Sequence, residues 1–169
     1  RIAAAAEAYL ADEDAPMQAQ ATLEKLSPRD VYRLGIDANP DSVSLRVGLA
    51  EYEYFSGNQD QAEDEFQRAR AVEAKTADDL HALAVFCFRT TGTAAGDSRA
   101  QMGLELWEAA RRMDPSFLDA YASPAELHLR RREYGQVVDL CRAGLKVIEN
   151  GLAGRELRDI EDLQTRGLY

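Results

Sequence analysis

The amino-acid sequence predicts an all-α protein, built as a stack of antiparallel helix hairpins. The first observation is a helical spacing, because Ala62, Phe66 and Ala69 follow one another at intervals of four and three residues. On a helix these intervals place all three residues on one narrow stripe. The second observation is that the same stripe returns along the chain with steps of 34, 41 and 34 residues. The third is that glycine and proline fall between the repeated segments, where helices end.

The returning stripe has two columns of residues, three positions apart. The first column mostly holds a large residue and the second always holds Gly or Ala. The pairs are Tyr32 with Gly35, Phe66 with Ala69, Trp107 with Ala110, and Cys141 with Gly144. Small residues let two helix axes approach closely, while the large residue fills the gap between one hairpin and the next. We expect both columns to be core, so that Phe66→Ala or Trp107→Ala costs about 3 to 5 kcal/mol of stability.

Local signals place the helix ends in chain order. Ser27 is a cap residue before a first-turn proline, Pro28, and the prolines at 40 and 115 follow helix ends. Gly57 and Gly151 suit helix C-terminal exits. The expected helices are 2–11, 16–26, 28–38, 41–56, 59–73, 76–91, 98–113, 117–131, 134–149 and 153–166. The last has one apolar stripe and is expected to cap the stack, with its polar side toward water.

The composition is that of a single globular domain. The 169 residues are 46% apolar and 30% charged, and no apolar run approaches the length of about 18 residues that a membrane span needs, so we expect a soluble, cytoplasmic chain. The formal net charge of −10 disfavours phosphate backbones and acidic lipid surfaces, so nucleic acid and membrane are not expected as partners. Cys87 and Cys141 are expected to be small buried hydrophobic residues, because free cysteine is among the most buried residue types.

The 34-residue period resembles the tetratricopeptide repeat (TPR) family. The best unit is 43–76, with Leu49 and Ala50 in its first helix, Gly57 in its turn and the stripe described above in its second helix. The resemblance implies a right-handed α-solenoid of about four repeats plus terminal helices, in one domain spanning residues 1–169. Its expected parts are a degenerate start and repeat at 1–42, a repeat at 43–76, a repeat with a turn insertion at 77–117, a repeat at 118–151, and a capping helix at 152–169.

No constellation of catalytic, cofactor-binding or metal-binding residues is present in the sequence. The insertion holds Gly92 and Gly96 with three residues between them, whereas a phosphate loop needs four and then Lys followed by Ser or Thr. His81 and His128 are the two histidines, and neither has a second metal ligand at helical spacing. We therefore expect no enzyme activity, no cofactor and no metal, with both histidines packed or solvated.

What remains is a binding surface. The TPR resemblance implies that the first helices of successive units line a concave groove that accepts a peptide or a partner helix. The lining would be Ser44, Val47, Gly48, Glu51, Tyr54 and Phe55, then Asp78, His81, Ala82, Val85, Phe88 and Arg89, then Asp119, Ala122, Ser123, Glu126, Leu129 and Arg130. The binding residues predicted within it are Val47, Glu51, Tyr54, His81, Val85, Phe88, Arg89, Glu126, Leu129 and Arg130.

The chemistry of this lining suggests a class of ligand. Tyr54, Phe88 and Leu129 would form an apolar strip for an amphipathic helix or an apolar peptide, and Arg89 and Arg130 would take a carboxylate. The cationic clamp of the TPR subclass that binds chaperone tails is absent from these columns. An equal alternative is that the strip packs against a neighbouring helix, or that another part of the full-length protein fills the groove.

The sequence thus predicts a non-catalytic scaffold for protein–protein interaction. Three alternatives remain open at this point. The chain could be a docking or regulatory segment of a larger, enzymatic protein, it could be a self-association unit that forms a homo-oligomer, or it could be an enzyme of unfamiliar type.

Overall fold

The structure, a computed structural model, describes residues 26–90 and 98–165, with side chains as far as Gly151. These residues form seven helices and no strand, which confirms the predicted all-α class. The helices are α3 (Pro28–Ala38), α4 (Val43–Phe55), α5 (Gln59–Ala71), α6 (Ala77–Arg89), α7 (Ser98–Met113), α8 (Asp119–Arg130) and α9 (Tyr134–Thr165). The helix expected at 2–11, nearly all of the one at 16–26 and the insertion from Gly92 to Gly96 lie outside the described residues.

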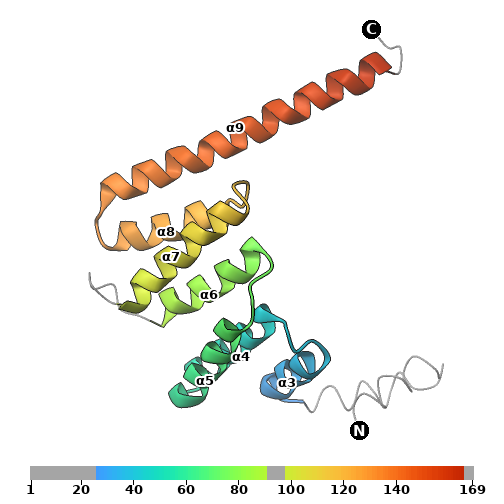
Figure 1. The fold of residues 1–169 in the computed structure, drawn as a ribbon. Coiled ribbons are helices and arrows are strands. Elements are labelled where there is room, and N and C mark those ends of the chain that lie inside the picture. The colour runs from blue at the N-terminus through green and yellow to red at the C-terminus, as the bar shows by residue number, and fades with distance from the viewer. Residues whose placement is uncertain (1–25, 91–97, 166–169) are drawn as a thin grey trace, which may run out of the picture.

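Helices α4 to α9 form three antiparallel hairpins, α4 with α5, α6 with α7 and α8 with α9, and α3 packs on α4 (Figure 1). The hairpins stack into a curved α-solenoid, as predicted. Helix α6 packs on both α4 and α8, whereas α5, α7 and α9 do not pack on one another over the described ranges. The layer formed by α4, α6 and α8 is therefore the closely packed, concave side of the curve.

Two helices begin with reciprocal hydrogen bonds at their caps. Before α3, the hydroxyl oxygen of Ser27 accepts from the Asp30 N–H at 3.3 Å, and the Asp30 carboxylate accepts from the Ser27 N–H at 3.1 Å. Thr76 and Asp79 form the same pair before α6, with both bonds at 3.1 Å. Each pair satisfies N–H groups that the first turn of a helix leaves without partners. The predicted start of a helix at Pro28 is confirmed.

The turn between α4 and α5 depends on a residue with positive φ. Gly57 has φ 87°, its N–H donates to the Tyr54 carbonyl at 3.1 Å, and the Asn58 N–H donates to the Glu53 carbonyl at 2.8 Å. This is a Schellman turn, and the predicted helix exit at Gly57 is confirmed. Arg132 holds the equivalent repeat position between α8 and α9, with φ 60° and the same pair of hydrogen bonds at 3.0 and 2.9 Å.

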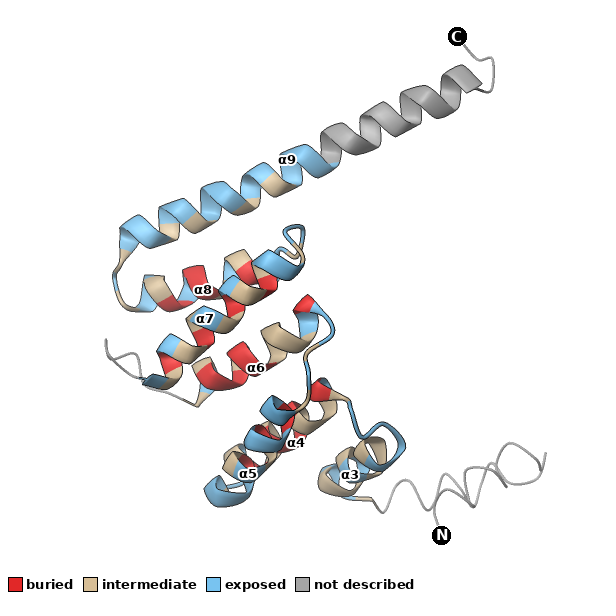
Figure 2. Ribbon diagram, in the orientation of Figure 1, coloured by how far each residue is buried: buried red, intermediate tan, exposed pale blue. Residues whose placement is uncertain are grey.

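The predicted columns form the core of the stack (Figure 2). Phe66 is completely buried and stacks on Phe86 of the next hairpin, with ring centroids 4.6 Å apart. Trp107 is also completely buried and packs against Leu127 of the hairpin after it. The small residues that follow these aromatics, Ala69 and Ala110, are completely buried too. Each hairpin is therefore covered by the first helix of its successor.

The joint between α3 and α4 combines a close contact with a buried ion pair. A Cβ placed on Gly48 would lie 2.5 Å from a ring carbon of Tyr32, so any larger residue here would displace the Tyr32 ring. Glu53 is only 2% exposed, and its carboxylate accepts from Arg29 at 2.5 Å and from the Asn58 side chain at 2.9 Å. Both donors offset the loss of solvation that a buried carboxylate suffers.

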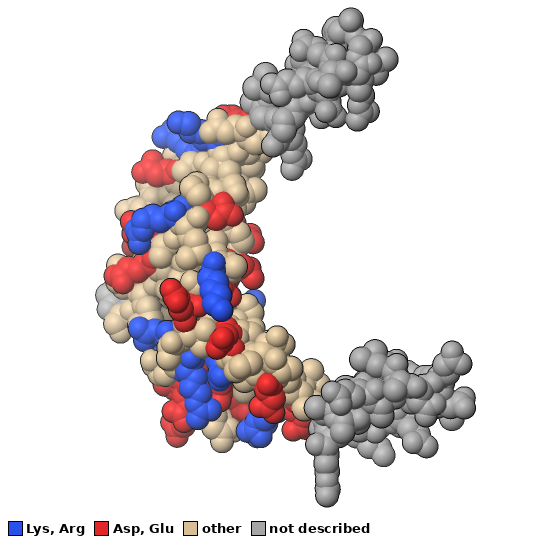
Figure 3. All heavy atoms as spheres, turned by 45° about the vertical axis from the view of Figure 1, so that its right-hand side comes forward, with Lys and Arg blue, Asp and Glu red and all other residues tan. Residues whose placement is uncertain are grey.

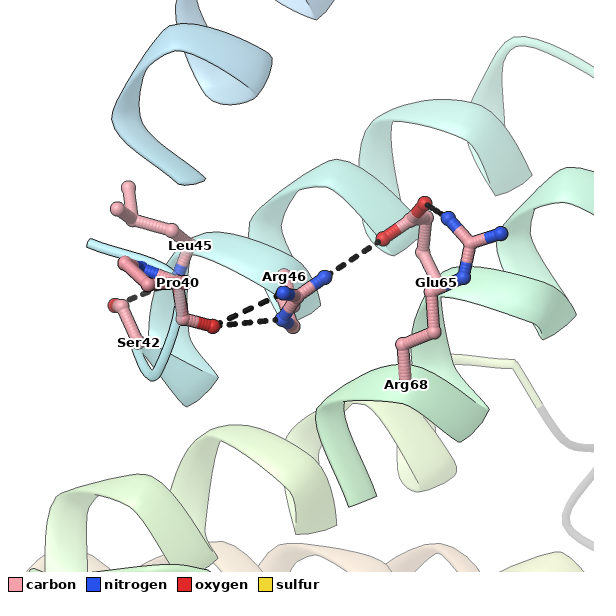
Figure 4. A network of polar contacts seen from close by, with 6 residues as sticks. All are labelled: Pro40, Ser42, Leu45, Arg46, Glu65 and Arg68. Atoms are coloured by element: carbon pink, nitrogen blue, oxygen red, sulfur yellow. Dashed lines mark hydrogen bonds and ion pairs between the residues drawn. The ribbon is translucent and has the colours of Figure 1, made fainter. Parts of the chain in front are cut away.

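Arg46 connects the turn before α4 to helix α5 (Figure 4). Its guanidinium donates to the Pro40 carbonyl at 2.9 and 3.2 Å, and it lies 3.7 Å from the Glu65 carboxylate. Glu65 also accepts from Arg68, at 2.6 Å. This chain of contacts holds the linker between α3 and α4 against α5.

Two sequence-based expectations at the C-terminal end are wrong. The helices expected at 134–149 and 153–166 are one continuous helix, α9, so Gly151 is not a helix exit. A single glycine in a helix interior costs only about 1 kcal/mol, which the helix-forming residues on both sides outweigh. Cys141 is exposed rather than buried, because over the described residues α9 packs only against α8. The division of the chain into the expected repeats and a cap stays a prediction.

Candidate functional site

A hollow of about 230 Å³ opens on the concave side between α4 and α6. Its lining comes entirely from the first two rungs that the sequence predicts for the groove. The lining residues are Ser44, Val47, Gly48 and Glu51 of α4, and His81, Ala82, Val85 and Arg89 of α6. Five of the ten predicted binding residues thus meet in one place, and Val47, Ala82 and Val85 supply its apolar surface.

The position of His81 is fixed by a buried tryptophan. The Nε1–H of Trp107 donates to Nδ1 of His81 at 3.1 Å. Since the indole nitrogen can only donate, Nδ1 must be the unprotonated nitrogen, and the proton of neutral His81 is on Nε2. Burial lowers the pKa of His81 below its ordinary value, and the nearby carboxylates of Asp119 and Asp78 oppose this only in part. His81 is therefore neutral near neutral pH, and its Nε2–H is a hydrogen-bond donor.

Both groove arginines already contact carboxylates of this chain. Arg89 donates to both carboxylate oxygens of Glu51, at 2.9 and 3.1 Å, and so joins α6 to α4 across the hollow. Arg130 donates to Glu126 at 2.5 Å, one turn away on α8. Its guanidinium also lies 4.6 Å from the centre of the Phe88 ring. A ligand carboxylate would have to compete with these contacts.

The predicted apolar strip does not line the hollow. Tyr54 is half-buried and meets the rings of Phe55 and Phe86 edge-on, while Phe88 is half-buried with its ring edge-on to Trp107. Leu129 is 53% exposed on α8. Tyr54 and Phe88 are thus mainly core residues of the stack. The other two predicted residues outside the hollow, Glu126 and Arg130, are exposed on α8.

A second hollow, of about 270 Å³, lies between α7, α8 and α9 and brings several charged side chains together. Two of its polar side chains already make contacts within the fold. Arg111 donates to the Ala120 carbonyl at 2.6 Å, and Nδ1 of His128 lies 2.5 Å from the Glu133 carboxylate. No group of three or more potential metal ligands occurs among the described residues. This hollow therefore gives no specific indication of catalysis.

The surface charge is mixed on the side that Figure 3 shows, where acidic and basic side chains alternate along the curved body. None of the described helices combines the length and the apolar character that a membrane span requires. The two cysteines differ sharply: burial raises the pKa of the Cys87 thiol to about 11, whereas Cys141 is exposed.

Comparison with known proteins identifies no family. No protein-family model matches the chain, and no curated protein matches it either. Among solved structures, the crystal structure of MamA is similar, with 14% sequence identity over 85% of this chain and 99% of that chain, and a TM-score of 0.49. The assignment of the fold therefore rests on the helices and their packing described above.

Proposed function

We propose that the chain is a non-catalytic scaffold that binds a peptide or a partner helix on its concave side. The observation that carries the proposal is the hollow between α4 and α6, which combines an apolar surface with polar groups at its rim. Val47, Ala82 and Val85 suit an aliphatic side chain of the ligand. The Nε2–H of His81 suits a carbonyl oxygen of the ligand backbone.

The charges around the hollow favour a ligand that is neutral or basic. The rungs on α4, α6 and α8 carry the carboxylates Glu51, Asp78, Asp119 and Glu126, and two arginines that already contact two of them. The net charge of −10 on the chain also attracts basic ligands and repels acidic ones at longer range. We expect bound peptides to carry an aliphatic residue flanked by basic rather than acidic residues.

Selection from a random peptide display library on the immobilised full chain tests the proposal. Ala82→Arg fills the hollow with a long side chain, and Ala143→Arg adds the same side chain at an exposed position of α9. Selected peptides should bind Ala82→Arg about tenfold or more weakly than the parent, because the pocket for one apolar side chain is lost. They should bind Ala143→Arg as they bind the parent.

Two results would count against the proposal. One is a library that yields no peptide with measurable affinity, and the other is a set of peptides that bind Ala82→Arg unchanged. Circular dichroism and urea denaturation show whether both variants are folded. A folding defect can then be distinguished from a loss of binding. A double variant of the predicted apolar strip, Tyr54→Ala with Phe88→Ala, would be a poorer test of binding. Both aromatic rings pack against the core, so their loss would also destabilise the fold.

A further inference from the structure

Helix α9 carries a stripe of exposed apolar residues. Its members are Tyr134, Val138, Cys141, Leu145 and Ile148. Tyr134 is 60% exposed and Leu145 is 58% exposed, and much of the described α9 surface is exposed in Figure 2. Scattered apolar residues are normal on a protein surface, but a continuous row along four turns of one helix needs an explanation.

The stripe lies to one side of the face of α9 that packs on α8. The half-buried residues of α9, which pack toward α8, are Val137, Leu140, Gly144 and Val147. Each of the last four stripe residues follows one of these by one position, which is a rotation of about 100° around the helix. In the part of the chain that the structure describes, no helix except α8 packs on α9. A further helix could therefore lie along the stripe without displacing α8.

The spacing of the stripe residues indicates how a partner helix would pack on α9. Successive members are four, three, four and three residues apart, which is a period of 3.5. Apolar residues at this period form the seam of a left-handed coiled coil, in which two helices run side by side with interlocked side chains. An ordinary amphipathic surface helix shows a broader stripe, so the regular 3.5 period favours a helical partner over an irregular one.

The charges beside the stripe identify a suitable partner. Arg142 and Glu149 are exposed, lie seven residues apart and occupy the same row on the side of the stripe that faces away from α8. In an antiparallel pair of α9 helices with Leu145 of each copy level with Ile148 of the other, Arg142 comes within two residues of the other copy's Glu149. Two residues correspond to about 3 Å along the helix axis, which the long side chains can span. Because the dimer is two-fold symmetric, the Arg142–Glu149 contact occurs twice.

We infer that α9 is the interface of a homodimer, in which the stripes of two copies pack as an antiparallel two-helix coiled coil. A parallel pair would place the Arg142 and Glu149 row against the row of Val137 and Gly144, which holds no charge and packs on α8. The antiparallel arrangement places both α8 helices on one side of the seam, opposite the paired charges of Arg142 and Glu149. It also leaves the concave hollow between α4 and α6 open, so dimer formation and peptide binding are independent.

Sedimentation velocity of the full chain over a range of concentrations tests the dimer. We expect a monomer–dimer equilibrium in the parent. Leu145→Asp with Ile148→Asp should weaken it by about 100-fold or more, because each apolar residue removed from the seam is worth about tenfold or more. Both side chains are exposed in the single chain, so circular dichroism of this variant should match the parent.

A charge exchange tests the antiparallel register. Arg142→Glu places like charges together and should weaken the dimer about tenfold. Arg142→Glu combined with Glu149→Arg restores opposite charges in the antiparallel pair and should return the affinity to near the parent value. Ala143→Glu is the control, because Ala143 is exposed on the side of α9 opposite the stripe and should leave the equilibrium unchanged.

Three results would overturn the inference. The first is a parent chain that remains monomeric at about 100 μM, which is well above the Kd of a typical specific complex. The second is a double aspartate variant that dimerises like the parent. The third is a charge exchange that fails to restore the dimer. The Ala82→Arg variant should dimerise like the parent. Loss of peptide binding and loss of dimerisation can therefore be told apart.

Discussion

Helices α7 and α9 have the same place in successive hairpins but very different surroundings. Each is the second helix of its hairpin, and Trp107 of α7 holds the same column as Cys141 of α9. Trp107 is completely buried and packs on Leu127 of α8. Cys141 is exposed, and no described helix follows α9 to cover it.

The comparison shows that the repeat position alone does not decide whether a residue is core. The successor helix decides, because each hairpin buries one face only when the next hairpin stacks on it. Phe66 and Phe86 form the same contact one hairpin earlier, with their rings stacked. The apolar stripe of α9 is the face that a further hairpin would cover.

The largest expected effect compares the two columns directly. Trp107→Ala should lower the free energy of unfolding by about 3 to 5 kcal/mol, because it removes a fully buried aromatic ring. In the Leu145→Asp background, which weakens pairing between copies, Cys141→Ala should change it by less than about 0.5 kcal/mol, as for most exposed positions. Urea denaturation followed by far-ultraviolet circular dichroism measures both. Equal effects for the two variants would mean that α7 and α9 do not differ as described.

Substitutions in the small-residue column should also affect stability more in α7 than in α9, with smaller changes in the free energy of unfolding. Ala110 is completely buried beside Ala77 and Ala120, so Ala110→Leu should overpack the contact and cost about 1 to 3 kcal/mol. A Cβ on Gly144 would lie 3.4 Å from the Cβ of Tyr121, which is an ordinary contact. Gly144→Ala should therefore stabilise the chain by up to about 1 kcal/mol through helix propensity. Thermal melts that rank the two variants in the opposite order would contradict this account.

The turns before the second helices offer a smaller test. Arg132 adopts φ 60° where Gly57 adopts φ 87° in the equivalent turn. Residues other than glycine are strained by about 1 kcal/mol in this region, so Arg132→Gly should raise stability by about that amount and Gly57→Ala should lower it similarly. Chemical denaturation of both variants provides the measurement, and a destabilised Arg132→Gly would show that the arginine makes a compensating contact.

The burial of His81 should also make the stability of the fold depend on pH. Because burial lowers the pKa of His81 in the folded chain, the unfolded chain binds the proton more readily. The contribution of neutral His81 to the free energy of unfolding is therefore fully present above the ordinary pKa of histidine. It is lost as the pH falls from that value through the lower pKa of the folded chain. The facing carboxylates of Asp78 and Asp119 oppose the effect. His81→Asn keeps an acceptor for the indole N–H, and its urea midpoint should fall less than that of the parent between pH 7 and pH 5.

Much of the fold could be predicted because its signals are local. The spacing of Ala62, Phe66 and Ala69, the cap at Ser27 and the turn at Gly57 each depend on a few neighbouring residues. The TPR resemblance implied a concave position for Ser44 to Glu51 and for His81 to Arg89. The five predicted residues that line the hollow are consistent with that register.

The remaining features depend on contacts between distant residues. Glu53 is buried only because Arg29 and Asn58 approach it from other segments, and nothing in the local sequence indicates the pairing. The pairing of Arg89 with Glu51 likewise spans two hairpins. The continuity of α9 through Gly151 could not be predicted, because glycine suits a helix exit and is also tolerated in a helix interior at a cost of about 1 kcal/mol.

The reactivity of the two thiols tests the central claim most directly. The claim is that α9 carries a core column of the repeat with no described helix over it. In the Leu145→Asp variant, which weakens pairing between copies, Cys141 should react with a thiol reagent in the folded chain, whereas Cys87 should react only on unfolding because it is buried with a raised pKa. One rapidly labelled thiol per folded chain, located at Cys141, is the predicted result. Protection of Cys141 equal to that of Cys87 would contradict the account.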